Sequence, residues 1–212
     1  MESTTTTLDW AMAEILANPR VLNKVQEEVD MVVGKERIVG MEDLPNLRYT
    51  KAVIKETLRK HTPGPLLLPR VSMEECELEL VGDGSYKIPK GTTVLVNAWA
   101  IANDPATWDM PENFMPERFL EGGREKVFDV RGQHFELVPF GSGRRVCPGI
   151  VLALGIVELT VATLVQCFEW VVHDVVDMTE RNGLSAPREA PLFASPTKFR
   201  LTQVVPAVQP KP

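Results

Sequence analysis

The chain has 212 residues, and its 23 Lys and Arg against 29 Asp and Glu give a formal net charge of −6. A composition of 44% hydrophobic and 25% charged residues is that of a folded globular protein, which excludes intrinsic disorder. The acidic balance argues against nucleic acid as a partner, because binding to a phosphate backbone depends on clustered Lys and Arg. Seventeen prolines predict long ordered loops rather than a simple helical bundle.

Helices dominate the predicted structure of the first 60 residues. The apolar pattern predicts one helix over residues 2–17. A second helix follows, because Asn18 can cap it, Pro19 suits its first turn, and Gly34 can end it in the left-handed conformation. A third helix is predicted over residues 47–60, since the prolines and glycine that come next stop it.

Short strands are predicted after the third helix. Residues 66–71, 77–81, 86–88 and 93–96 have strand character and are separated by turn residues, which predicts a small antiparallel sheet. Residues 104–140 show no sustained periodicity of either kind. The aromatic side chains in that range predict an ordered, packed loop, which in a compact domain is usually functional.

The longest apolar run covers residues 150–167 and would form a helix about 27 Å long. It carries polar side chains and lacks a basic flank, so we predict a buried core helix rather than a membrane span. Weak strand patterns follow at 169–172 and 198–202. The predicted fold class is therefore mainly α with a small antiparallel β-sheet (α+β), with one domain over residues 1–204 and a disordered tail at 205–212.

A glycine-punctuated loop, residues 139–149, stands directly before the apolar helix and contains Cys147. The helix N-terminus and the neighbouring Arg144 and Arg145 would stabilise a thiolate there. Three interpretations are open on these residues alone: a nucleophile, a metal ligand, or a structural cysteine in a turn. A nucleophile needs a nearby base, and none of the three histidines lies in an obvious partner motif. A single thiolate does not bind zinc by itself, whereas a cofactor that brings its other ligands would need only one.

Five residues of this loop match the FxxGxRxCxG heme-binding loop of the cytochromes P450: Phe140, Gly143, Arg145, Cys147 and Gly149. Two further signatures occur in the expected order. Residues 56–59 (ETLR) resemble the ExxR of the K helix in that family, and residues 116–119 resemble its PERF segment. The resemblance extends from Glu2 to about Thr202, and it implies the carboxy-terminal portion of the cytochrome P450 fold.

The resemblance implies heme b (iron protoporphyrin IX) as cofactor, with Cys147 as the axial thiolate ligand of the iron. The two glycines of the motif would allow the backbone to approach a flat macrocycle closely. Phe140 would shield the sulfur from water. Arg145 and Arg70 would bind the heme propionates, although Arg70 could instead be a solvated charge at a strand end.

The ExxR and PERF segments imply a structural network of Glu56, Arg59 and Arg118. Glu56 and Arg59 lie three apart on one helix face, where an exposed pair would contribute only about 0.5 kcal/mol. In the family this pair joins the PERF arginine in a buried network that anchors the long loop under the heme. We therefore expect Glu56, Arg59 and Arg118 to be structural and not catalytic.

The first residues of the chain resemble the end of the oxygen-activating motif of the family, [A/G]-G-x-[D/E]-[T/S]. Glu2 would match the acid and Ser3 the alcohol, and Thr4 lies one position further. The resemblance implies that these groups deliver protons during oxygen activation. The alternative is that they form only a frayed helix start.

Residues 97–101 and 131–135 resemble plant microsomal monooxygenases of phenolic metabolism, above all the flavone- and isoflavone-forming group. The resemblance implies insertion of one oxygen atom from dioxygen into an apolar aromatic, phenylpropanoid- or flavonoid-like substrate. Electrons would come from NADPH through NADPH-cytochrome P450 reductase, at the cytosolic face of the endoplasmic reticulum. Five residues are candidate substrate contacts: Leu66, Leu67, Leu68, Leu192 and Phe193.

Two other functions are weighed against the monooxygenase. The chain is expected to be truncated within the I helix and to lack the membrane anchor, which would make it a non-catalytic heme-binding fragment without turnover. A heme-thiolate isomerase or dehydratase, which needs no reductase, is the less favoured alternative. A positive cluster would offer a docking face for an acidic reductase, or would be solvated loop charge: Arg124, Lys126, Arg131, Arg144 and Arg145.

Overall fold

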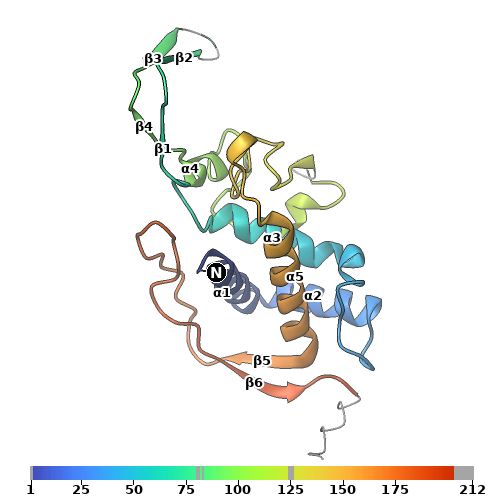
Figure 1. The fold of residues 1–212 in the computed structure, drawn as a ribbon. Helices are drawn as coiled ribbons and strands as arrows, with labels where there is room; N and C mark the ends of the chain where they lie inside the picture. The colour runs from blue at the N-terminus through green and yellow to red at the C-terminus, as the bar shows by residue number, and fades with distance from the viewer. Residues whose placement is uncertain (1, 80–81, 83, 124–126, 203–212) are drawn as a thin grey trace, which may run out of the picture.

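The structure is a computed structural model that describes residues 2–79, 82, 84–123 and 127–202 (Figure 1). Its α-helices in this range are α1 Glu2–Ala17, α2 Pro19–Val32, α3 Arg48–Lys60, α4 Ala98–Ala102 and α5 Ile150–Cys167. Its strands are β1 Arg70–Val71, β2 Cys76–Glu79, β3 Ser85–Ile88, β4 Thr93–Val94, β5 Phe168–Val172 and β6 Ala194–Phe199. The predicted fold class, mainly α with small antiparallel strands, is confirmed. Residues 203 and 204 of the predicted domain, and the predicted tail, lie outside the described residues.

The body of the fold is a layer of helices in which α5 packs against α1, α2 and α3 (Figure 1). Helix α2 is amphipathic, and its buried side chains Val21, Val25 and Val29 recur every four residues on one face. Gly34 ends that region with φ +82°, as its position in the sequence predicts. Asn18 precedes α2 but donates its side-chain amide to Glu14 of α1 rather than capping the helix.

Helix α5 is long and apolar enough to cross a membrane, and no other helix of the described ranges meets that criterion. Its carboxy-terminal half is packed, since Val157, Val161 and Val165 are buried among the other helices. Its amino-terminal turns expose Val151 and Leu152 at 73% and 70%. The carboxy-terminal half of α5 is thus part of the core, whereas its amino-terminal turns line open space.

The strands form three separate two-stranded antiparallel ladders, β1–β4, β2–β3 and β5–β6, rather than one small sheet. The β2–β3 hairpin stands at the end of an arm, and β5–β6 lies at the opposite end of the molecule (Figure 1). Residues 66–69 are not a strand, because the flanking prolines have no N–H for a ladder and Leu67 is in a turn with φ +50°. The strand predicted there shrinks to Arg70–Val71.

Residues 104–123 and 127–140 are an ordered loop around Trp108, which is completely buried. The rings of Phe119 and Phe128 pack against Trp108 at centroid distances of 6.0 and 5.3 Å. The short helix α4 precedes this loop and was missing from the sequence prediction. Its local signal is Asn97, whose side-chain oxygen accepts a hydrogen bond from Ala100 N at 2.9 Å.

Glu56, Arg59 and Arg118 meet in the interior and connect α3 to the loop. Arg59 donates to both carboxylate oxygens of Glu56 at 2.8 and 2.9 Å, and Arg118 Nε donates to Oε1 at 3.1 Å. Arg59 also donates to the carbonyls of Ala102 and Pro111, each at 2.8 Å. The network therefore ties three sequence regions to a single buried carboxylate.

Substituting Glu56→Gln should lower the free energy of unfolding by about 3–5 kcal/mol, because two buried guanidinium groups lose their counter-charge. Chemical denaturation measures this. The matched control is Glu169→Gln, because Glu169 pairs with Lys198 at 3.5 Å on the exposed surface and should contribute no more than about 0.5 kcal/mol. Equal effects of the two substitutions would contradict a structural role for the buried network.

Candidate functional site

A cavity of about 890 Å³ opens beside Cys147, which is within the size range of small-molecule sites. Its walls come from the first turns of α1, the carboxy-terminal end of α3, the loop over residues 139–149, the start of α5 and a second loop over residues 181–185. Cys147 is exposed to this space. Parts of the chain that are distant in sequence thus converge on one thiol, with the cysteine loop and the start of α5 forming one continuous stretch.

The cysteine loop is a sequence of tight turns. Cys147 N donates to Phe140 O at 2.9 Å, and this bond closes the loop. Gly143 begins a 3₁₀ turn, η4 (Gly143–Arg145), with φ +66°, a left-handed conformation that favours glycine. A side chain at Gly149 would place its Cβ 3.8 Å from the Cys147 sulfur. The motif residues therefore shape the loop so that the sulfur faces open space.

The structure bears on two of the interpretations of Cys147. Within the described residues, no group of three or more His, Cys, Asp or Glu is placed to bind a metal ion, so a zinc site made by protein ligands alone is not formed. The three histidines contact groups other than the thiol, namely Glu14 for His61, the Phe128 ring for His134, and Ser195 for His173. No histidine base is therefore positioned to activate Cys147 as a nucleophile.

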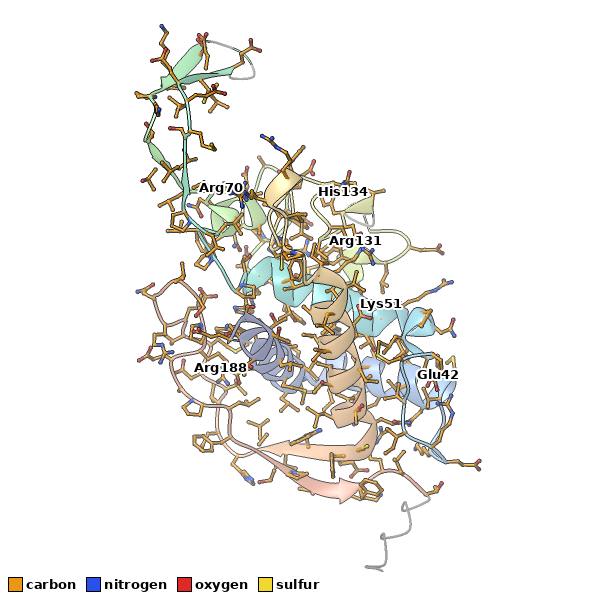
Figure 2. All side chains as sticks on the ribbon, in the orientation of Figure 1. Glu42, Lys51, Arg70, Arg131, His134 and Arg188 are labelled. Atoms are coloured by element: carbon orange, nitrogen blue, oxygen red, sulfur yellow. The ribbon has the colours of Figure 1, made fainter. Side chains whose placement is uncertain are left out.

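Two arginines line the same cavity as the thiol. Arg70, labelled in Figure 2, lies at the start of β1 and is half-buried. Arg145 lies in the exposed η4 turn. An ideal Cβ at Gly141 would lie 3.5 Å from Arg70 Nη2, so the guanidinium reaches across to the cysteine loop. A lone thiol, two guanidinium groups and apolar walls fit the donor set that a heme with two propionates requires.

The first turn of α1 lines the cavity through Glu2, Ser3 and Thr4. Glu2 Oε1 accepts a hydrogen bond from Ser185 Oγ of the second loop at 2.6 Å. Thr7, one turn further, donates its hydroxyl to Ser3 O at 2.8 Å and also lines the cavity. A carboxylate and several hydroxyls are thus gathered at one wall of the space next to Cys147.

The predicted substrate contacts lie in different places. Leu67 and Leu68 line the cavity, whereas Leu66 is not among the lining residues. Leu192 packs against the hydrophobic core, and Phe193 is 75% exposed and does not line the cavity. Residues 181–185 line it instead, and the sequence analysis missed them, because turn residues mark a loop without showing what the loop contacts.

The predicted positive cluster is described only in part. Arg124 and Lys126 lie outside the described residues. Arg131 and Arg144 are exposed, and Arg131 Nε lies 3.4 Å from Asp129 Oδ2 (Figure 2). Arg145 is shared between the surface and the cavity rim.

Comparison with known proteins adds an independent observation. A family model described as Cytochrome P450 matches residues 1–193. A flavonoid 3'-monooxygenase of Petunia hybrida is 44% identical over 200 residues, covering 92% of this chain and 38% of that protein. An iridoid oxidase of Catharanthus roseus is 48% identical over 202 residues, covering 93% and 38%. A dimethylnonatriene synthase of Zea mays is 50% identical over 199 residues, covering 91% and 36%.

Solved structures agree with these relatives. A zebra fish cytochrome P450 structure with progesterone superposes with a TM-score of 0.79 at 37% identity, covering 92% of this chain and 43% of that chain. The chain spans less than half the length of the curated relatives described above.

Gly143→Ala should reduce heme uptake by the chain, because a Cβ at φ +66° strains the turn that presents Cys147. Titration with heme, followed by absorbance, measures this. The control is Gly84→Ala, which places the same side chain at φ +88° in the β2–β3 arm. Both substitutions should lower the stability of the fold, but only Gly143→Ala should lower heme uptake. An equal fall in heme uptake in the two variants would contradict a specific role for the cysteine loop.

Proposed function

Because the chain belongs to the cytochrome P450 family, we propose that it is the heme-binding part of a monooxygenase that inserts one atom of dioxygen into a small apolar substrate. The observation that carries this proposal is the exposed Cys147 thiol in a cavity with Arg70 and Arg145 on its rim. Within the described residues, no group of three or more His, Cys, Asp or Glu at this cavity could hold a metal ion, which suits a cofactor that supplies its own nitrogen ligands.

Each lining residue has a role in this proposal. Cys147 would bind the iron of heme b, and Arg70 and Arg145 would bind the propionates by charge-assisted hydrogen bonds. Phe140 would cover the sulfur side and exclude water. When bound, heme supplies the redox chemistry of dioxygen, with electrons from NADPH through a reductase. The bond from Cys147 N to Phe140 O keeps the loop closed around the sulfur.

The hydroxyl and carboxylate groups of α1 would handle protons. Glu2 Oε1 already accepts a hydrogen bond from Ser185 Oγ, so a carboxylate and a hydroxyl form a short polar path at the cavity wall. Ser3 and Thr4 line the same wall, one residue apart. We assign Glu2, Ser3 and Thr4 to proton delivery into the cavity, since a positioned acid and alcohols are the groups that such a relay needs.

The proposed substrate is apolar and aromatic, of phenylpropanoid or flavonoid type. Leu67, Leu68 and Leu184 give the cavity an apolar wall. Flavonoid 3'-monooxygenases are among the relatives, alongside proteins named for other apolar substrates at similar identity. The lining favours a small apolar molecule, and the resemblance to flavonoid enzymes makes a flavanone the first substrate to test.

Two further parts of the proposal concern the protein's surroundings. The exposed guanidinium groups of Arg131, Arg144 and Arg145 offer a positive face to an acidic NADPH-cytochrome P450 reductase. The resemblance to plant microsomal enzymes supports a location at the cytosolic face of the endoplasmic reticulum membrane.

Cys147→His should abolish the thiolate-type absorbance of the reduced carbon monoxide complex in the heme-loaded chain. The expected cause is replacement of an anionic sulfur ligand by a neutral nitrogen. Cys76→His is the matched control, because Cys76 is also exposed but lies on the β2–β3 arm. A spectrum that is unchanged by Cys147→His would refute the ligand assignment.

Leu67→Phe should change the affinity for a flavanone at least threefold while leaving heme content intact, because the larger ring enters the cavity. Equilibrium dialysis with naringenin measures the affinity. Leu66→Phe makes the same change at a neighbour that does not line the cavity, and it should have little effect. Loss of heme with Leu67→Phe would show that Leu67 supports the fold rather than the substrate.

A further inference from the structure

The second loop of the cavity wall contains an Asn-Gly pair, Asn182-Gly183. We propose that this pair is a site of spontaneous covalent modification: the Gly183 amide nitrogen displaces ammonia from the Asn182 side chain, and water then opens the resulting succinimide to aspartate or isoaspartate. The product adds a carboxylate to the wall of the cavity. The effect on substrate rests on the proposed function, whereas the modification itself does not.

The sequence around Asn182 favours this reaction. Of the seven asparagines in the chain, Asn182 alone is followed by glycine. Ring closure requires the amide nitrogen of the next residue to approach the side-chain carbon of the asparagine, and a side chain on that next residue hinders the approach. Glycine has no Cβ and the widest choice of backbone angles. Asn182 is therefore the asparagine of this chain that can form the ring most easily.

The base of the loop is fixed by backbone hydrogen bonds, and its tip is not. Glu180 and Arg188 form an antiparallel bridge at the base, and Arg188 is labelled in Figure 2. Next to this bridge, Arg181 N donates to Pro187 O at 2.8 Å. The next backbone bond along the described chain is donated by Ala186 N, at 3.1 Å. The residues between these two bonds therefore form the tip of the loop.

The two groups that react are exposed and unrestrained. Within the described ranges, no hydrogen bond involves the Asn182 side chain or the Gly183 amide nitrogen. Among these residues, therefore, no polar contact has to break before the ring closes. An ideal Cβ at Gly183 would lie 2.9 Å from Ser185 O, so the chain curls back directly after the pair. Exposed loop tips of this kind open at little cost in free energy, and the fold gives the pair no protection.

The reaction needs water and no other reagent. The Gly183 nitrogen loses its proton and forms a bond to Cγ of Asn182, while the Cγ–Nδ2 bond breaks and ammonia leaves with that proton. Water then adds to one of the two carbonyls of the cyclic imide. Opening at the side-chain carbonyl gives aspartate, and opening at the main-chain carbonyl gives isoaspartate, in which the backbone runs through the side-chain carbons. Neither step oxidises or reduces any atom.

The product changes the cavity wall in two ways. Asn182 lines the cavity, whose wall also carries the apolar side chains of Leu67 and Leu184. A carboxylate at this position places a charge beside a bound apolar molecule, and removal of a charge from water is costly. Isoaspartate also lengthens the backbone by a methylene. Because Ser185 is hydrogen-bonded to Glu2 Oε1 at 2.6 Å, the added length falls between the fixed base and this contact.

Peptide mapping of the full chain measures the modification without heme. After incubation at neutral pH, the peptide that contains Asn182 should gain the mass difference between an amide and an acid. A methyltransferase specific for isoaspartate should label the same peptide, and digestion at acidic pH avoids deamidation during handling. The folded chain should react within about threefold of the rate of the urea-unfolded chain, because no contact protects the pair. A folded rate about tenfold slower, or slower still, would overturn the proposal.

Two controls show whether the reaction belongs to this pair. Asn113 is also exposed but is followed by Phe114, so its peptide should stay unmodified over the same time. Asn182→Gln is the matched variant, because the longer side chain would have to close a larger ring, which forms more slowly. Its loop peptide should show neither the mass gain nor the label. Equal modification at Asn113, or a label that persists in Asn182→Gln, would overturn the proposal.

Equilibrium dialysis with naringenin connects the modification to the cavity. Each heme-loaded chain is compared with its own fresh sample, so that differences between the variants before ageing do not enter. Ageing should weaken binding by the modified fraction of the unsubstituted chain about threefold or more, and it should leave Asn182→Gln unchanged. An equal loss in the two chains would refute the effect on the cavity. A fresh chain that does not bind naringenin would count against the proposed function, and the peptide map would still decide the modification.

Discussion

The buried carboxylate of Glu56 is the interaction on which the arrangement of this chain depends. Two guanidinium groups, from Arg59 and Arg118, lie against it in a region with almost no access to water. Buried charges are costly unless they are paired and hydrogen-bonded, and here the remaining N–H groups reach backbone carbonyls of the loop. The loop that leads to the cysteine is thus attached to α3 by charge rather than by regular secondary structure.

This attachment explains how a chain with long irregular segments can position a thiol. Residues 104–123 and 127–140 contain no strand or α-helix, and they are ordered by Trp108 packing and by the Glu56 network. The cysteine loop follows at once and is closed by its own backbone bond from Cys147 to Phe140. The buried ion network therefore fixes the position of the long loop, and the cysteine loop that follows it fixes the position of the sulfur.

Local patterns in the sequence were sufficient for α1, α2, α3 and α5 and for the cysteine loop. Pro19 and Gly34 marked the ends of α2, and five loop residues placed Cys147 before α5. The strand predicted over residues 66–71 is limited to Arg70–Val71 because prolines interrupt the rest, and α4 was missed although Asn97 caps it. The wall at 181–185 could not be predicted, since long-range contacts from His61 and Pro63 decide where that loop lies.

Two parts of the cavity lining are built by different means. On the cysteine side, the lining residues are close in sequence and a single loop positions them. Elsewhere in the lining, Leu67 and residues 181–185 come from separate turns, and the second of these is held by side-chain contacts at its ends. Leu67 lies close to the cysteine loop, since an ideal Cβ at Gly141 would be 3.7 Å from Leu67 Cδ1, whereas residues 181–185 reach the cavity from a separate part of the chain.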